Sequence, residues 1–383
     1  MAPTGYINAA DFRTCLLTLG KDTVGSINSS AISALNDGKK RLGVAAHRSM
    51  VDSPEKIEKA IARDISINCS LIIGVGEAFV EPLMNQAKYH RARHFALLLP
   101  PGATAQATRD NVAIVTYDLS QPAYVAGFIA AGTSASGQVA AIAGAKNRTN
   151  QTLLAAFAKG VARYNTEQAE KNSQAVKVNA KADGNGLYLG EKTSAPHVKG
   201  EVETLIKQGA DVIFFAEGVQ DPAGLAAISK ENQDREKAAK AAAEARESAQ
   251  PDGEPASNSP SESTGESNPS PEPTAVVPEN DAVGSVTAIW YLTDGHQTQS
   301  SPAGKTPPVL TSIVPDLSQA MISLIEQARK DRYAANSTQI LGTYKNGWVG
   351  LTPFYEYDST VPNGVKKKSQ TIEEEFRQGT LKL

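Results

Sequence analysis

The sequence predicts an α/β protein of two doubly wound lobes with parallel sheets, and three observations carry that prediction. Short apolar runs alternate with helical patterns along the chain, and the alternation stops once and then restarts. The runs lack the every-second-residue pattern of half-exposed strands, which is typical of parallel strands buried on both faces. A length of 383 residues with 40% hydrophobic content is enough for two such cores.

The segment AYVAGFIAAG separates the two series of predicted strands. The first series lies at residues 12–20, 41–47, 69–76, 94–100 and 111–118. The second lies at residues 137–145, 175–183, 210–218 and 285–295. A later segment, 316–331, carries an i, i+3, i+4 apolar stripe that predicts a helix. The chain ends in a strand-like stretch around GWVGLTPFYEY.

Residues 230–284 belong to neither lobe. Residues 230–248 are rich in Ala, Lys and Glu without a wide apolar stripe, which predicts an exposed, projecting helix. The segment that follows carries seven acidic residues and seven prolines, and no basic residue. Because it cannot bury enough apolar surface to offset its ordering entropy, we expect disorder. A flexible arm for a partner surface and an inert surface loop are both open interpretations.

Charge and motifs exclude several functions. A formal net charge of -3 argues against nucleic acid as a partner. The five histidines show no metalloprotease spacing, and neither a nucleophile elbow nor a Walker A loop is found. In GVGEAF, Phe79 occupies the place of the third glycine of a dinucleotide fingerprint. We therefore expect neither an enzyme nor a cofactor or metal site.

The two cysteines, Cys15 and Cys69, fall in the first and third predicted strands. These strands are neighbours in a sheet of order 2-1-3-4-5, so a disulfide and two buried free thiols are both open. No apolar run reaches the ~18 residues of a spanning helix. The start, MAPTGYINAADF, lacks the features of a signal peptide, as in a cytoplasmic protein or a secreted one whose leader was removed.

Several turns follow predicted strands and are rich in small or polar residues. They lie at 18–28, 74–79, 214–218 and 291–295, and the first contains Gly20 and Gly25. Ligands of open α/β sheets bind beyond the carboxyl ends of strands, so two facing lobes would enclose one cleft closed by a hinge. This arrangement predicts a clamshell binding protein in which Gly76, Glu217 and Gly218 contact a small molecule.

Six segments, in order, resemble motifs of the basic membrane protein family of ABC-transporter substrate-binding lipoproteins. They are GSINSSAISAL, CSLIIGVG, AYVAGFIAA, QGADVIFFAEG, WYLTDGHQ and VLTSIV. The resemblance covers nearly the whole chain apart from about residues 230–284. It implies a type I periplasmic-binding-protein-like clamshell and a small-molecule ligand, because the best-understood members of the family bind purine nucleosides.

The resemblance also implies roles for particular residues. The signature asparagine of the family, which reaches the ligand, falls on Asn28 beside Ser26, although Asn28 also suits a helix N-cap. The ribose-binding carboxylate falls on Asp294, which also suits the cap of the next turn. A second stacking aromatic falls on Tyr188. The first turn is therefore expected to hold one edge of a polar solute.

Four family positions carry different residue types here. Thr18 and Gln121 stand at acidic positions, Ile27 stands at the stacking aromatic, and Pro315 stands at a lysine. Thr18 and Gln121 are still expected to contact the ligand. The sequence thus predicts a receptor for a nucleoside or similar polar solute. The alternative is a diverged surface lipoprotein with a different small-molecule ligand or none.

The resemblance further implies lobes, partners and location. The N-terminal lobe is expected to comprise residues 1–118 plus 309–340, and the C-terminal lobe residues 119–295 plus 341–383. We expect a monomer that delivers its solute to an ABC permease and is anchored outside the cell as a lipoprotein, by a leader absent from this chain. Export favours a disulfide between Cys15 and Cys69.

Overall fold

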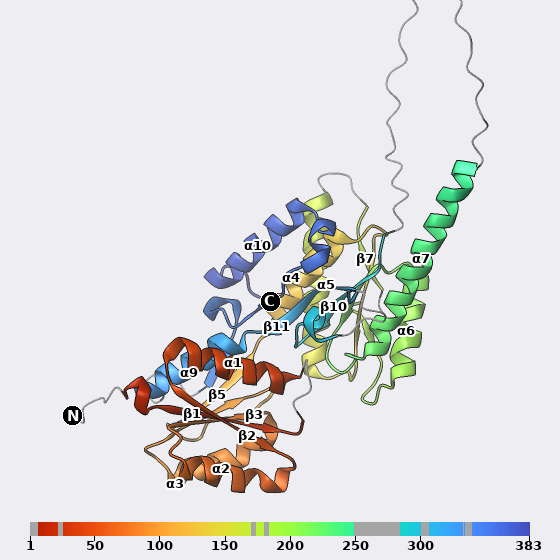
Figure 1. The fold of residues 1–383 in the computed structure, drawn as a ribbon. Helices are drawn as coiled ribbons and strands as arrows, with labels where there is room; N and C mark the ends of the chain where they lie inside the picture. Colours follow the sequence, from red (N-terminus) through yellow and green to blue (C-terminus); the bar gives the residue numbers. More distant parts are fainter. Residues whose placement is uncertain are drawn as a thin grey trace, which may run out of the picture.

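The computed structural model describes most of the chain as two α/β lobes (Figure 1). The described residues are 7–21, 26–169, 174–179, 184–248, 284–299, 306–331, 333 and 339–383. Gly25 and the predicted acidic segment at 249–283 lie outside them. Within the described part, no helix combines the length and hydropathy that a membrane span requires.

The first lobe is built on a six-stranded, fully parallel sheet. Its order is β12 (Gln339–Gly342), β5 (Val112–Tyr117), β4 (His94–Leu98), β3 (Leu71–Val75), β1 (Arg13–Leu19) and β2 (Ala45–Val51). The predicted order 2-1-3-4-5 is confirmed, with β12 added beside β5. β2 begins later than predicted because residues 41–42 complete the preceding helix.

Helices cover both faces of this sheet, because successive residues of a strand point to opposite faces. Leu16 of β1 faces α1 (Ile27–Leu42) and α9 (Leu317–Arg329), whereas Leu17 faces α2 (Ile57–Ser66) and α3 (Val80–Tyr89). Figure 1 shows α1 and α9 on one side of the sheet and α2 and α3 on the other. The inner strands β1, β3 and β4 are buried on both faces, as their continuous apolar runs predicted.

The second lobe contains a seven-stranded sheet. Its order is β13 (Val349–Leu351), β11 (Val309–Pro315), β10 (Thr287–Tyr291), β9 (Val212–Phe215), β6 (Gln138–Ala143) and β7 (Lys177–Asn179), with β8 (Leu187–Tyr188) also paired to β6. Only the pairing of β13 with β11 is antiparallel. One face is covered by α4 (Ser120–Thr133), α5 (Arg148–Ala169) and α10 (Asn363–Gln378). The other is covered by α6 (Ala195–Lys207) and α7 (Pro222–Ser248).

Two predictions for the last third of the chain are wrong. β11 pairs with β10, so residues 309–315 belong to the second sheet and not to the N-terminal lobe. The apolar run at these residues predicts a strand, but it does not predict which sheet the strand joins. The chain also continues past the predicted terminal strand into α10, whose Val365, Ile372 and Phe376 are buried against the second lobe.

The hinge consists of segments that hydrogen-bond side by side. The chain crosses between the lobes at 118–119, at Asp316 and at 343–348. The Asp118 N–H donates to Gly342 O at 2.8 Å, and the Asp316 N–H donates to Trp348 O at 2.8 Å. Bending of the hinge must therefore move these paired segments together.

Two glycines bring α4 and α5 into close contact. A side-chain carbon on Gly127 would lie 2.0 Å from Phe157 O, and one on Gly160 would lie 1.9 Å from Tyr124 O. Only glycine tolerates such an approach of two backbones. The tight packing explains why the segment AYVAGFIAAG, predicted only as a break between strand series, is a helix buried almost all round.

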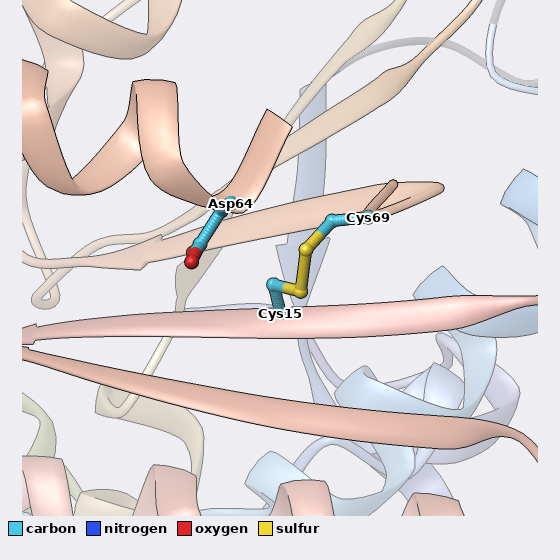
Figure 2. Close-up of side chains that lie close together, drawn as sticks. All are labelled: Cys15, Asp64 and Cys69. Carbon is cyan, nitrogen blue, oxygen red and sulfur yellow. A yellow bond between two sulfur atoms is a disulfide. The ribbon is translucent and has the colours of Figure 1, made fainter. Parts of the chain in front are cut away.

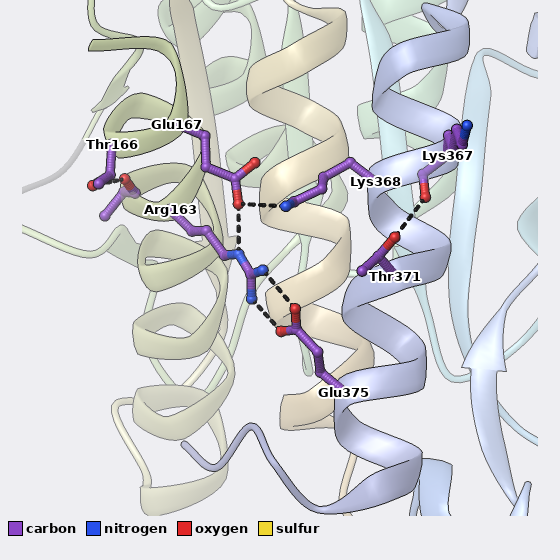
Figure 3. A network of polar contacts seen from close by, with 8 residues as sticks. Arg163, Thr166, Glu167, Lys367, Lys368, Thr371 and Glu375 are labelled. Carbon is purple, nitrogen blue, oxygen red and sulfur yellow. Dashed lines mark hydrogen bonds and ion pairs between the residues drawn. The ribbon is translucent and has the colours of Figure 1, made fainter. Parts of the chain in front are cut away.

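A charged network fastens α5 to α10 (Figure 3). Arg163 donates to both carboxylate oxygens of Glu375, at 2.6 and 2.9 Å, and to Glu167 at 3.0 Å. Lys368 Nζ lies 3.3 Å from the same Glu167 oxygen. The bond from Arg163 lowers the pKa of Glu375, and the carboxylate raises the pKa of Arg163 in return. Such a two-point contact fixes geometry more firmly than a single ion pair.

The predicted disulfide between Cys15 and Cys69 is present, in the fully buried core between the first sheet and α2 (Figure 2). Asp64 of α2 lies beside it and accepts from Ser49 Oγ at 2.8 Å. Burial raises the pKa of Asp64. Because both sulfur atoms are bonded to each other, neither is available as a thiolate ligand for a metal ion.

The predicted projecting helix is confirmed as the outer part of α7, which is exposed and extends away from the lobe (Figure 1). The part of α7 nearest the lobe is hydrogen-bonded to the segment by which the chain returns from the insertion. Asn232 exchanges hydrogen bonds with the backbone of Val286 at 2.8 and 2.9 Å, and Arg235 donates to Gly284 O at 2.7 Å. The segments that lead into and out of the insertion are therefore held together by hydrogen bonds at one place on the second lobe, which we call the neck of the insertion.

Candidate functional site

The first candidate edge lies at the carboxyl end of β1. Ser26 is the N-cap of α1 and accepts from the Ser29 N–H at 3.2 Å. The N-cap interpretation of Asn28 is therefore wrong. Its side-chain amide instead donates to Leu19 O at 2.9 Å and ties α1 to the end of β1. Thr18, the residue before Leu19 in β1, is fully buried.

Gly76 continues this edge after β3. Its backbone φ of 99° requires glycine, and its N–H donates to Leu98 O at 2.9 Å. The same N–H is therefore already used within the sheet. Gly76 shapes the turn between β3 and α3 through its conformation.

The second lobe presents Asp294 after β10. Asp294 caps the short helix α8 (Gly295–Thr298), and its Oδ1 accepts from the N–H groups of His296 and Gln297 at 3.1 and 3.4 Å. Its Oδ2 accepts from the hydroxyl of Tyr355 at 2.5 Å. Both oxygens of the predicted sugar-binding carboxylate thus have partners in their own lobe.

Tyr355 was not predicted. Its ring stacks on the His296 ring with centroids 4.0 Å apart, and Gln297 Nε2 donates to its hydroxyl at 2.9 Å. His296 Nε2 lies 2.5 Å from Glu356 Oε2. The only sequence signal was the aromatic cluster PFYEY, which does not reveal that this segment returns to the end of β10.

Glu217 and Gly218 form the end of β9 beside β6. The Glu217 carbonyl accepts from the Gly144 N–H at 2.8 Å and from the Asn150 side chain at 3.1 Å. Gly218 has φ of 87° and packs against Gly144, which leaves no room for a larger residue. Burial raises the pKa of the Glu217 carboxyl, although a hydrogen bond from Asn147 opposes the shift.

Tyr291 adds an unpredicted polar group to this edge. Its hydroxyl is buried and has no hydrogen-bond partner among the described residues. Burial and the neighbouring charge of Glu217 raise the pKa of Tyr291. A buried hydroxyl without a partner costs free energy, so a ligand that bonded to it would gain affinity.

Two cavities lie near the predicted residues. A cavity of about 520 Å³ lies between α1 and the hinge, and its lining includes Ser29, which follows Asn28 in the chain, and Gln297 of α8, the helix that Asp294 caps. Pro315 also lines this cavity. A larger cavity of about 940 Å³ is lined by Gln121 and Tyr188, but not by Asn28 or Asp294. Of the predicted site residues, the structure therefore brings only Gln121 and Tyr188 together around one of these two cavities.

Comparison with protein families gives one match. A family model described as "Bmp: ABC transporter substrate-binding protein PnrA-like" matches residues 25–239. Among curated proteins, none matches the chain at a significant level.

Solved structures share the fold across nearly the whole chain. A solute-binding protein of an ABC transporter system from Conexibacter woesei is 17% identical, with a TM-score of 0.64 over 97% of this chain and 98% of its own. A similar protein from Aeropyrum pernix is 16% identical, with a TM-score of 0.59 over 97% and 92%. A transcriptional activator of the comK gene from Bacillus halodurans is 16% identical, with a TM-score of 0.63 over 96% and 99%. At these identities the likeness shows the fold alone, a two-lobed clamshell of the type I periplasmic-binding-protein kind.

Proposed function

Because the chain belongs to the Bmp family of PnrA-like ABC transporter substrate-binding proteins, we propose that it binds a nucleoside or similar polyhydroxylated solute between its lobes. The observation that carries this proposal is the position of Asp294 at the carboxyl end of β10. Ligands of parallel α/β sheets bind at this edge, and a carboxylate there accepts two neighbouring sugar hydroxyls. Asn28 stands at the matching edge of the first sheet.

Family membership implies a small-molecule ligand and a membrane permease as partners. We propose that the chain acts as a monomer outside the cell and is held to the membrane as a lipoprotein. The disulfide supports an oxidising location, since such bonds persist mainly outside the cytosol.

A second candidate is a diverged surface lipoprotein of the same fold whose cleft takes another ligand or none. One observation favours it, because both oxygens of Asp294 already accept hydrogen bonds within the second lobe. Ile27 also lacks the aromatic face of the family residue, and loss of a stacking ring removes about 1–3 kcal/mol of base binding.

A thermal-shift screen with nucleosides, free bases, riboflavin and sugars separates the two candidates. A solute present at 100 times its Kd stabilises the folded chain by about 2.7 kcal/mol. The shift should shrink to half or less in Asp294→Asn and persist in full in Asp221→Asn, a matched control because Asp221 accepts from the Ala223 N–H at the start of α7. If no compound in the panel stabilises the wild-type chain, the result favours the second candidate, the diverged surface lipoprotein.

A further inference from the structure

A groove along the hinge carries an unusual excess of positive charge. The cavity of about 940 Å³ is bounded by α5, by the crossing segments near Gln121 and Thr343, and by residues 379–383. Five cationic side chains line it, Lys146, Arg148, Lys159, Lys345 and Lys382. Asp118 is the only acidic side chain among the described lining residues, and its Oδ1 accepts from the backbone N–H and hydroxyl of Ser120.

Four of these five cations have no partner among the residues that the structure describes. Among the described residues, Arg148, Lys159, Lys345 and Lys382 form neither an ion pair nor a hydrogen bond. By contrast, Arg163, one turn beyond Lys159 on α5, is paired with two carboxylates (Figure 3). Uncompensated like charges around one hollow repel each other, and a bound anion would relieve that repulsion.

The length of the groove favours an extended anion as its ligand. Arg148 and Lys159 are eleven residues apart on the same face of α5, or about 16 Å along its axis. Lys345 also lines the groove, on the segment that crosses between the lobes. A single phosphate group is too small to contact both ends. A ligand that contacts both ends must therefore carry at least two separated negative groups.

The uncharged residues that line the groove include Gln121 and Tyr188. The side-chain oxygen of Gln121 accepts from the Tyr344 N–H at 2.9 Å, so its amide nitrogen is left to donate to an anion. The Tyr188 ring lies 5.2 Å from Lys146 Nζ, which holds that ammonium against one wall. These two residues were predicted to contact a nucleoside, but the structure places them among the cations.

We propose that this groove binds an extended small-molecule anion of the polyphosphate class beside the hinge, at a place lined by neither Asn28 nor Asp294. The proposal rests on the charge and shape of the groove and does not depend on the nucleoside assignment. Its chemical requirement is two or more phosphate groups whose charges are spread along α5.

The probe is tripolyphosphate, titrated calorimetrically into the full chain at low ionic strength, with orthophosphate as the single-group comparison. Tripolyphosphate should bind at one site and more tightly than orthophosphate, and its affinity should fall as salt is added. Arg148→Gln, Lys159→Gln and Lys345→Gln should each weaken binding about two- to fivefold, and the triple variant by about tenfold or more.

The matched control combines Lys59→Gln, Lys88→Gln and Lys207→Gln, which remove the same charge from exposed helical lysines elsewhere. It should bind tripolyphosphate as the wild type does. If the control variant lost as much affinity for tripolyphosphate as the groove variant, the loss would be due to net charge alone, and the proposal would be overturned. Unchanged binding in the groove triple variant, or orthophosphate binding as tight as tripolyphosphate, would also overturn it. Salt dependence of the wild type and the single variants tests the site even if the triple variant folds poorly.

Discussion

The hydroxyl of Tyr355 donates to Asp294 Oδ2 at 2.5 Å, and this bond joins the end of β10 to a segment 61 residues later in the chain. The other oxygen, Oδ1, caps α8. A solute that uses the Asp294 carboxylate must therefore share it with, or displace, a phenol that the protein itself supplies.

Tyr355→Phe is expected to strengthen binding of a ribose-bearing solute about fivefold, because one hydrogen bond that competes for Asp294 is removed. The control is Tyr357→Phe, whose hydroxyl forms no hydrogen bond among the described residues. Calorimetric titration of both variants measures the difference. Equal affinity in Tyr355→Phe and wild type would mean that the phenol does not compete with the solute.

Asp294→Ala should weaken the same solute by roughly 10- to 150-fold, the range for loss of a hydrogen bond to a charged group. Asn28→Ala should cost less affinity but lower the free energy of unfolding by about 1 kcal/mol, because Leu19 O loses its donor. Titration and denaturant unfolding of both variants separate binding from stability. Unchanged affinity in Asp294→Ala would favour the diverged-lipoprotein candidate.

Replacing both Cys15 and Cys69 with Ala should lower the free energy of unfolding by about 4 kcal/mol, because the bond closes a loop with a sequence separation of 54. The intact mass of the natively secreted chain should be two hydrogens below that of the reduced chain. Two alkylatable thiols in unreduced, natively secreted protein would contradict the disulfide.

The pair Arg163–Glu375 should make stability depend on pH. The bond from Arg163 lowers the folded-state pKa of Glu375, so its stabilisation is present above the unfolded pKa near 4.3 and is lost as pH falls through the lower folded value. Glu375→Gln should cost about 1 kcal/mol at neutral pH and little at strongly acidic pH. Glu374→Gln, which loses only surface contacts with Arg377 and Gln378, serves as the control in urea unfolding at several pH values.

Replacement of residues 249–283 by a short Gly-Ser linker should leave the fold intact, since Asn232 and Arg235 already hold the neck of the insertion closed. Solute affinity should change by less than about threefold, as expected for an insertion that lies outside the site. Melting temperature and titration test this outcome. A larger change in affinity would place the insertion at the cleft.

Structural features that depend on short stretches of the chain could be predicted from the sequence. The buried strand around Leu16 and Leu17 is a continuous apolar run, and such runs form the same parallel strands wherever helices cover both faces. The strand order 2-1-3-4-5 predicted that Cys15 and Cys69 lie close together but left a disulfide and two free thiols open, and the family resemblance, which implies export, favoured the disulfide. Gly76 and Asp294 were predicted as site residues because they follow predicted strands, and for Asp294 also because of the family resemblance.

The sequence by itself therefore determined the two α/β lobes and the strand-end turns, because each depends on patterns within about ten consecutive residues. The order of the first five strands followed from the arrangement that is common to doubly wound sheets. Only the tertiary structure decided that β11 joins the second sheet, that Tyr355 bonds to Asp294, and that Gln121 lines a basic groove with Lys345. These contacts join segments far apart in the chain. Hydrophobic periodicity states which face of a segment is buried, but not against which partner, and the partner is selected by packing of the whole chain.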